Sequence, residues 1–271
     1  MKSILVIGAH PDDCDFFAGG CAALWRRRGD RVRFVSMTNG DAGHHTMARR
    51  ALAERRRAEA ARAAEVIGIE YVVLHHHDGE LLPTLEIRSE VIRMVREFRP
   101  DLVLTHRPHD YHPDHRYTST LVLDSAYLVT VPLLCPGVPH LETNPVYGYL
   151  WDRFERPVPF RPDVVVDIDP VMDLKWEMLH WHSSQFYEWL PYNLRQGEPP
   201  LEPSARRRWL AETWSDELGR VAESSRDALA KRYGRERAER VRFAEAFEIA
   251  EQGRQPSTDE LRELFPLDVA V

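Results

Sequence analysis

The chain has 271 residues, which is enough for one α/β domain with a sizeable core and a C-terminal appendage. A formal net charge of −7 gives no electrostatic footprint for nucleic acid, and no apolar run reaches the length of a membrane span. Three cysteines without a CxxC pair support neither a disulfide framework nor a cysteine zinc site, and no signal peptide is recognised, so a cytoplasmic protein is expected.

The first predicted strand ends in a group of polar residues. Residues 4–8 are apolar and rich in branched side chains, which is typical of a buried parallel strand. His10, Asp12 and Asp13 follow at its carboxyl end, where open α/β sheets bind ligands. His10 and Asp13 are candidate metal ligands, which leaves Asp12 as a free carboxylate. The alternative is an ordinary strand-to-helix turn in which Asp13 caps the next helix.

Strand-like and helical segments alternate through the first two thirds of the chain, and this alternation predicts the fold. After the first strand, the predicted strands are 31–38, 71–74, 101–105, 147–151 and 164–168, and the predicted helices are 16–28, 46–67, 87–98, 117–128 and 173–185. Beyond Pro203 the chain is charged and predicted to be helical to about residue 251. We therefore expect a Rossmann-like, mostly parallel sheet flanked by helices at residues 1–190. A helical C-terminal extension, residues 191–271, packs on the same domain.

Three loops bear on the location of a site. Residues 39–45 follow the second strand at the same edge of the sheet, so His44 or His45 can contact a substrate or lie in a solvent loop. The three consecutive histidines 75–77 cannot all face one metal ion, because side chains alternate along a strand. Residues 129–145 contain four prolines and form a loop long enough to act as a lid.

A second polar cluster follows the strand predicted at residues 101–105. His112 and His115 lie three residues apart and share one helix face if Pro113 opens a helix. Two strands of one parallel sheet would then deliver His and Asp side chains to the same edge. Packing requirements alone do not explain that pattern, so the two clusters together favour a metal site.

The two clusters, residues 9–13 and 112–115, resemble the motifs of the LmbE/PIG-L family of zinc-dependent de-N-acetylases. Weaker similarities to the family lie at residues 38–43, 78–79 and 182–185 and in the spacing of Arg56 and Glu59. The resemblance runs from the N-terminus to about residue 185. It implies a hydrolase that removes an N-acetyl group from an N-acetylglucosamine-like sugar or glycoside. Family members often oligomerise, so a homo-oligomer is a further expectation.

The resemblance also implies the roles of individual residues. His10, Asp13 and His115 bind Zn²⁺ or another divalent ion, a donor set that suits a catalytic zinc with an open position for water. Asp12 acts as general base and later protonates the departing amine. The metal and a protonated His112 stabilise the oxyanion. The remaining expected residues are the substrate contacts Arg56, Asp41 and His44, and the carboxylates Asp110 and Asp114, which orient the imidazoles.

Several alternatives stay open at this point. Arg56 and Glu59 can form a surface ion pair, and Asp114 can simply cap its helix. A 2-His-1-carboxylate set also serves non-haem Fe(II) enzymes, although these usually sit on β-rich barrels. A non-catalytic sugar-binding protein of the same fold is a third class, although binding alone has no use for Asp12. A dinucleotide-binding protein is disfavoured because residues 8–11 do not form a G-x-G-x-x-G cradle.

Overall fold

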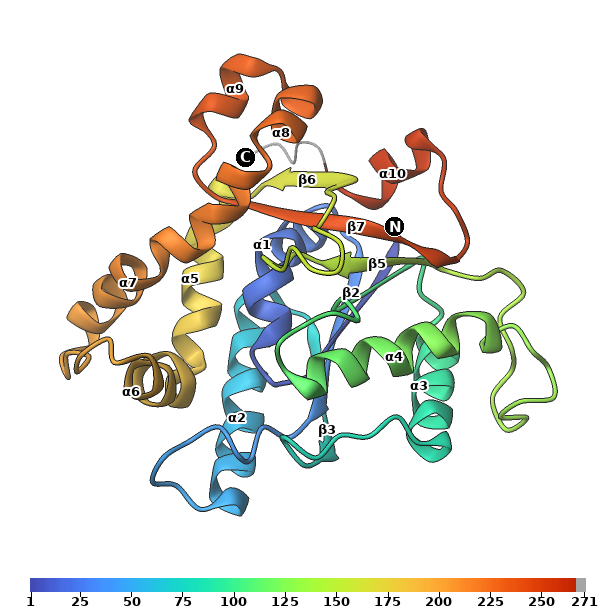
Figure 1. Cartoon of the computed structure of the whole chain (residues 1–271), viewed down its shortest axis with the longest axis horizontal. Helices are drawn as coiled ribbons and strands as arrows, with labels where there is room; N and C mark the ends of the chain where they lie inside the picture. The colour runs from blue at the N-terminus through green and yellow to red at the C-terminus, as the bar shows by residue number, and fades with distance from the viewer. Residues whose placement is uncertain (267–271) are drawn as a thin grey trace.

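The computed structural model describes residues 1–266 and shows a seven-stranded sheet with helices on both faces (Figure 1). The strands are β1 (Ser3–Gly8), β2 (Arg31–Thr38), β3 (Glu70–His76), β4 (Leu102–Thr105), β5 (Val146–Leu150), β6 (Val164–Asp167) and β7 (Ala244–Gly253). Their order across the sheet is β3-β2-β1-β4-β5-β7-β6, and β7 alone runs antiparallel to its neighbours. The mostly parallel α/β fold is thereby confirmed. The chain order reverses at β1, so the crevice between β1 and β4 is the expected ligand position.

Helices cover both faces of the sheet. They are α1 (Asp13–Arg27), α2 (Arg49–Ile67), α3 (Leu85–Phe98), α4 (Pro113–Leu128), α5 (Met172–Trp181), α6 (Leu190–Leu194), α7 (Pro203–Ser224), α8 (Arg226–Tyr233), α9 (Arg235–Arg240) and α10 (Thr258–Leu264), with a 3-10 turn at Asp169–Val171 and a π-helical turn at Gln185–Trp189. Ile4 and Val6 of β1 face the core beneath α1 and α5, while Leu5 and Ile7 face the core beneath α3 and α4. Burial on both faces explains why β1 reads as a continuous apolar run.

Within residues 191–266 the C-terminal extension is helical, as predicted, except for one strand. Residues 244–253 form β7 between β5 and β6, where an unbroken helical region was expected to about residue 251. Acidic residues interrupt the apolar alternation of this segment, so its strand pattern is weak in the sequence. Residues beyond 190 therefore complete the sheet, and a boundary at residue 190 does not separate the sheet from an appended helical part.

The loop at residues 129–145 is placed where it cannot act as a lid on the carboxyl edge of the sheet. It begins at the C-terminal end of α4, whose 16 residues span about 24 Å from the N-terminal end that carries His115. The buried guanidinium of Arg96 on α3 also fixes this loop. It donates hydrogen bonds to the backbone carbonyls of Leu128, Val129, Val131, Leu134, Cys135 and Val138.

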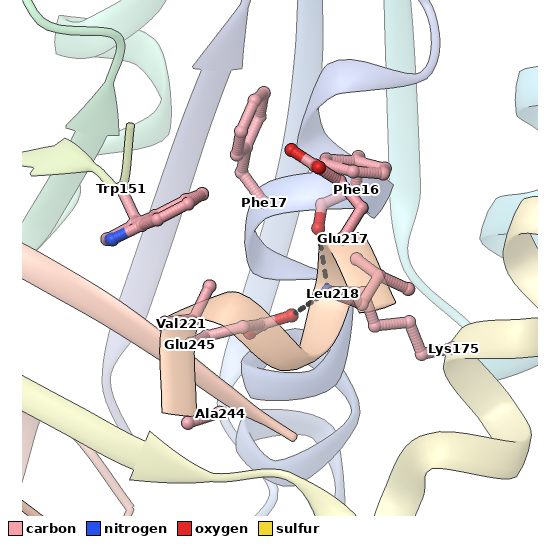
Figure 2. Close-up of a pocket in the computed structure, with 9 residues that line it drawn as sticks. All are labelled: Phe16, Phe17, Trp151, Lys175, Glu217, Leu218, Val221, Ala244 and Glu245. Carbon is pink, nitrogen blue, oxygen red and sulfur yellow. Dashed lines mark hydrogen bonds and ion pairs between the residues drawn. The ribbon is translucent and has the colours of Figure 1, made fainter. Parts of the chain in front are cut away.

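A buried ion pair joins α5 and β7 to α1. Lys175 Nζ and Glu245 Oε1 are 2.6 Å apart, with both side chains 2% exposed, beside a small cavity (Figure 2). Lys175 also donates to the carbonyl of Phe16, and Glu245 accepts the N–H groups of Gly20 and Cys21. In a regular helix the Gly20 N–H would bond to the Phe16 carbonyl, so the ion pair engages both groups. This ion pair links β7 to α1, the helix that begins in the first polar cluster.

Replacing Lys175 by methionine is expected to lower the free energy of unfolding by roughly 3–5 kcal/mol, because the carboxylate of Glu245 would stay buried without its cation. Denaturant unfolding measures this change. Lys231→Met is the matched control, since Lys231 is exposed on α8 and its loss should change stability by no more than about 0.5 kcal/mol. Equal stability changes in the two variants would show that the buried pair does not stabilise the fold.

No helix within residues 1–266 combines the length and the apolar character needed to cross a bilayer.

Candidate active site

Three segments bring polar side chains to the carboxyl edge of the sheet between β1 and β4. They are the β1–α1 turn, the turn after β3, and the connection from β4 to α4. β1 and β4 are hydrogen-bonded in parallel with Ile7 opposite Thr105, so the residues after both strands emerge side by side. The two polar clusters of the sequence therefore meet at the topological switch point.

His10, Asp13 and His115 place one donor atom each at the corners of a small triangle. His115 Nε2 lies 3.2 Å from His10 Nδ1 and 3.4 Å from Asp13 Oδ2, and His10 Nδ1 lies 3.4 Å from the same oxygen. A tetrahedral zinc ion with bonds of about 2.0–2.1 Å places its ligand atoms about 3.3–3.4 Å apart. All three residues are buried. The spacing and chemistry of these donors therefore fit a four-coordinate divalent ion with one open position.

Carboxylates lie against the far nitrogen of each imidazole in the triangle. His10 Nε2 is 3.3 Å from both Asp78 Oδ1 and Asp114 Oδ2, and His115 Nδ1 is 3.0 Å from Asp110 Oδ2. The hydrogen bond between His10 Nε2 and Asp114 leaves Nδ1 of His10 with its lone pair free for a metal, and the nearby carboxylate of Asp110 favours a proton on Nδ1 of His115. Burial alone would raise the pKa of Asp78, but the hydrogen bond from His10 and nearby positive charge hold it well below its usual range. The same balance lowers the pKa of Asp110 and of Asp114.

His112 borders the triangle and has its own hydrogen bond. Its ring lies 4.6 Å from that of His10 and 5.2 Å from that of His115, centroid to centroid. The N–H of Asp114 donates to His112 Nδ1 at 3.2 Å, as a cap of α4. This bond places the ring proton on Nε2. Burial and the neighbouring histidines lower the pKa of His112, so the structure favours a neutral N–H donor over the protonated imidazole that the sequence predicted.

The carboxylate of Asp12 lies outside the triangle, with one oxygen anchored. Arg56 Nη2 donates to Asp12 Oδ1 at 2.7 Å, and the Asp12 side chain is 16% exposed. Within residues 1–266, no hydrogen bond to Asp12 Oδ2 is present. Asp13, by contrast, accepts the N–H groups of Ala9 and His10, so it closes the turn and does not cap α1.

Arg56 is buried and has partners within the protein, so a direct contact between Arg56 and a substrate stays a prediction. Arg56 is 2% exposed, and besides Asp12 it donates to the carbonyl of Gly40. It forms no surface pair with Glu59, whose carboxylate accepts hydrogen bonds from Ser183 and Ser184. Arg56 is therefore placed to orient Asp12.

Asp41 and His44 have partners within the protein. Asp41 is 3% exposed and accepts hydrogen bonds from His77, Arg49 and the N–H of Asp78. His44 Nε2 lies 2.9 Å from Glu188, which ties the loop after β2 to the π-helical turn. The two side chains thus fix the loop that borders the site, and a direct contact with substrate stays a prediction.

Two site residues, Asp78 and His106, were given no role from the sequence, although residues 78–79 are among the weaker similarities to the family. His106 is the first residue after β4; its ring stacks on that of His115 at 3.9 Å, and its Nε2 lies 3.1 Å from Asp13 Oδ2. Asp78 follows β3 by two residues. Both obey the rule that predicted the other residues, namely that polar groups at the carboxyl ends of parallel strands converge. Applying it to β3 and to the first residue after β4 would have found them.

His106 and His112 are further candidate metal ligands. His112 with His10 and His115, or His106 with Asp13 and His115, places donor atoms within 4.8 Å of one another. His106 Nε2 already meets the N–H of Ala9, and His112 Nδ1 meets a backbone N–H. In the set of His10, Asp13 and His115, each imidazole ring is oriented so that one of its nitrogens faces the position of the metal ion.

The fold and this cluster define an α/β protein with a candidate mononuclear metal centre at the switch point of its sheet. Comparison with known proteins identifies the family. The family model described as PIG-L, GlcNAc-PI de-N-acetylase, matches residues 5–126. Diacetylchitobiose deacetylase of Thermococcus kodakarensis is 31% identical over 207 residues, which cover 71% of this chain and 75% of that protein. The chain belongs to the PIG-L family.

Two further relatives carry names that state different activities. The solved structure of N,N'-diacetylchitobiose deacetylase from Pyrococcus horikoshii, in complex with an inhibitor, has a TM-score of 0.73 and 25% identity over 95% of this chain and 88% of that one. The 4-oxalmesaconate hydratase of Pseudomonas putida is 27% identical over 200 residues, covering 71% of this chain and 77% of that protein. Relatives with different names share the sequence pattern, so the site has to decide between the reactions.

Proposed function

We propose that this protein is a metal-dependent hydrolase that removes the N-acetyl group from an N-acetylglucosamine-like sugar or glycoside. The observation that carries the proposal is the carboxylate of Asp12, anchored through one oxygen beside the triangle of His10, Asp13 and His115. A metal site that only binds a ligand has no use for a free base at this position. The names of the deacetylase relatives support the same reaction.

In this mechanism each side chain around the triangle has a separate role. Zn²⁺ held by His10, Asp13 and His115 would bring the pKa of a bound water toward 7 and polarise the amide carbonyl. Asp12 takes a proton from the attacking water on its free oxygen and delivers it to the nitrogen of the departing amine. His112 donates its Nε2–H to the oxygen on which negative charge develops. Arg56 holds Asp12 in position through both proton transfers.

The competing reaction is the addition of water to a carbon–carbon double bond, as the hydratase relative suggests. The charge of the site favours the amide. Five carboxylates gather there, those of Asp12, Asp13, Asp78, Asp110 and Asp114. Arg56 is already paired with Asp12, so apart from the metal ion these residues offer no free cation to a polyanionic substrate. An Fe(II) oxygenase is disfavoured because the ligands sit on a parallel α/β sheet and not on a β-barrel.

A product assay tests the proposal. Protein loaded with Zn²⁺ is incubated with N-acetylglucosamine and N,N'-diacetylchitobiose, and acetate and free amine are measured together. We expect the two products to appear in equal amounts and to disappear after chelation. The same preparation is given 4-oxalmesaconate and followed by absorbance. Loss of the double bond without acetate release from either sugar would replace the deacetylase assignment by a hydratase one.

A further inference from the structure

A fully buried histidine–aspartate pair lies outside the triangle and has no part in the proposed mechanism. His182 Nε2 lies 2.9 Å from Asp15 Oδ2, and both side chains are 0% exposed. Within residues 1–266, the other nitrogen of His182 and the other oxygen of Asp15 are buried without a hydrogen-bond partner. Burial of such groups costs free energy that well-packed apolar side chains of similar volume avoid. Stability alone is therefore a weak reason for this pair.

The pair joins the first turn of α1 to the end of α5. Asp15 lies three residues after Asp12, the residue at which α1 begins. The carbonyl of Asp12 accepts the N–H of Phe16 at 3.0 Å, so the backbone of Asp12 belongs to the same turn. His182 follows α5 directly, and its carbonyl accepts the N–H of Gln185 at the start of the π-helical turn. A displacement of Asp15 would therefore move the backbone that carries the Asp12 carboxylate.

The segment of residues 182–185 contacts every element that supports Asp12. Its histidine contacts α1, as described. Its two serine hydroxyls donate at 2.9 and 2.6 Å to Glu59, which follows Arg56 by three residues on α2. Its glutamine donates at 3.0 Å to the carbonyl of Gly43 in the loop after β2, the loop to which Arg56 also donates. One short segment thus holds both the backbone of Asp12 and the arginine bound to its side chain.

We propose that His182 is a positioning residue for the general base. Its hydrogen bond to Asp15 fixes the first turn of α1, and this turn sets the place of the Asp12 carboxylate beside the triangle. The inference rests on the proposed deacetylase function, in which Asp12 takes up a proton and delivers it again. Because proton transfer requires hydrogen-bond reach, a displacement of about 1 Å can lower the rate by about 100-fold. His182 acts on the reaction through Asp12 and does not contact the substrate.

Two amide substitutions of His182 test this role. Glutamine can place an N–H near the position of the imidazole Nε2, whereas the shorter asparagine does not reach Asp15. His182→Asn should lower kcat for acetate release by about 100-fold and change KM by less than about twofold, and His182→Gln should recover most of the loss. Rates are expressed per bound zinc ion, so that unfolded protein is not counted. Should His182→Asn not fold, Asp15→Leu removes the same hydrogen bond and carries the same expectation.

His180→Asn is the matched control for His182→Asn. His180 lies on α5 two residues earlier, and its Nδ1 is 2.7 Å from the hydroxyl of Tyr187, so the same change also removes a hydrogen bond there. Its kcat should equal that of the unmodified protein. A comparable loss in this control would show that any disturbance of α5 lowers the rate, and the specific role of His182 would be wrong.

A double variant distinguishes positioning of Asp12 from a general distortion of the site. In Asp12→Asn the base is already absent, so the addition of His182→Asn should lower kcat by less than about a further twofold. A general distortion would instead multiply the two losses. A further loss of about 100-fold in the double variant would overturn the inference and leave the deacetylase standing. So would a kcat of His182→Asn equal to that of the unmodified protein.

A crystal structure of His182→Asn provides a readout that does not depend on activity. We expect the Asp12 carboxylate to leave the contact with Arg56 Nη2, which is 2.7 Å long in the unmodified protein. If the unmodified protein releases no acetate from either sugar, the deacetylase proposal fails, and this structure alone decides whether His182 positions Asp12. An Asp12 carboxylate that keeps its place in the variant would contradict the positioning role.

Discussion

Replacing Asp12 by asparagine is expected to reduce acetate release by about 100- to 10,000-fold while the metal stays bound. Asparagine keeps the size of the side chain and an oxygen for the hydrogen bond from Arg56, but its amide cannot take up a proton. The triangle of His10, Asp13 and His115 does not include Asp12, so metal content should not change. Steady-state kinetics and metal analysis of the same preparation measure the two effects.

Asp124→Asn is the matched control for this variant. Asp124 undergoes the same chemical change on α4, where its side chain is half exposed and paired loosely with Arg88. Its activity should equal that of the unmodified protein. Turnover retained by Asp12→Asn would exclude Asp12 as the base, and loss of metal from that variant would show that Asp12 is itself a ligand.

Replacing His115 by alanine is expected to abolish both metal retention and deacetylation. This change removes one corner of the triangle and leaves two protein donors, fewer than the three that catalytic zinc sites use. Asp110→Asn should have a smaller effect, about a 10- to 100-fold loss of metal affinity, because it keeps all three ligands and only replaces the carboxylate that faces His115 Nδ1 by a neutral amide. Competition with a chelating dye measures both affinities.

His109→Ala serves as the control for the loss of His115. His109 belongs to the same β4–α4 connection but is exposed, so its replacement should leave metal affinity unchanged. If His115→Ala bound metal as tightly as the unmodified protein, the true site would have to be the donor set of His10, Asp78, His112 and Asp114, which lacks His115.

The sequence was sufficient to predict the part of the molecule that depends on local pattern. Residues 4–8 are apolar at every position because β1 is buried on both faces, so the strand and the polar turn after it could be read directly. The same reasoning applied to β4 and α4. Since carboxyl ends of parallel strands meet at one edge, the meeting of His10 with His115 followed from the predicted order of elements.

Features that depend on long-range partners were not predictable. Arg56 stands in a helix rich in Ala, Arg and Glu and reads as a surface residue, but its burial is stabilised by Asp12, 44 positions earlier. Glu245 was expected in a charged helix, but it lies in β7, where Lys175 and two N–H groups of α1 stabilise its buried carboxylate. In both cases the partner that stabilises the buried charge is distant in sequence, so no local pattern reports it.

The position of the bound metal tests the central claim most directly. Crystals of zinc-loaded protein, measured on both sides of the zinc absorption edge, would locate the ion by its anomalous signal. We expect one ion at about 2.0–2.2 Å from His10 Nδ1, Asp13 Oδ2 and His115 Nε2, with Asp12 outside the coordination sphere. An ion bound through His10 Nε2 and the carboxylates of Asp78 and Asp114, or one coordinated by Asp12, would contradict it.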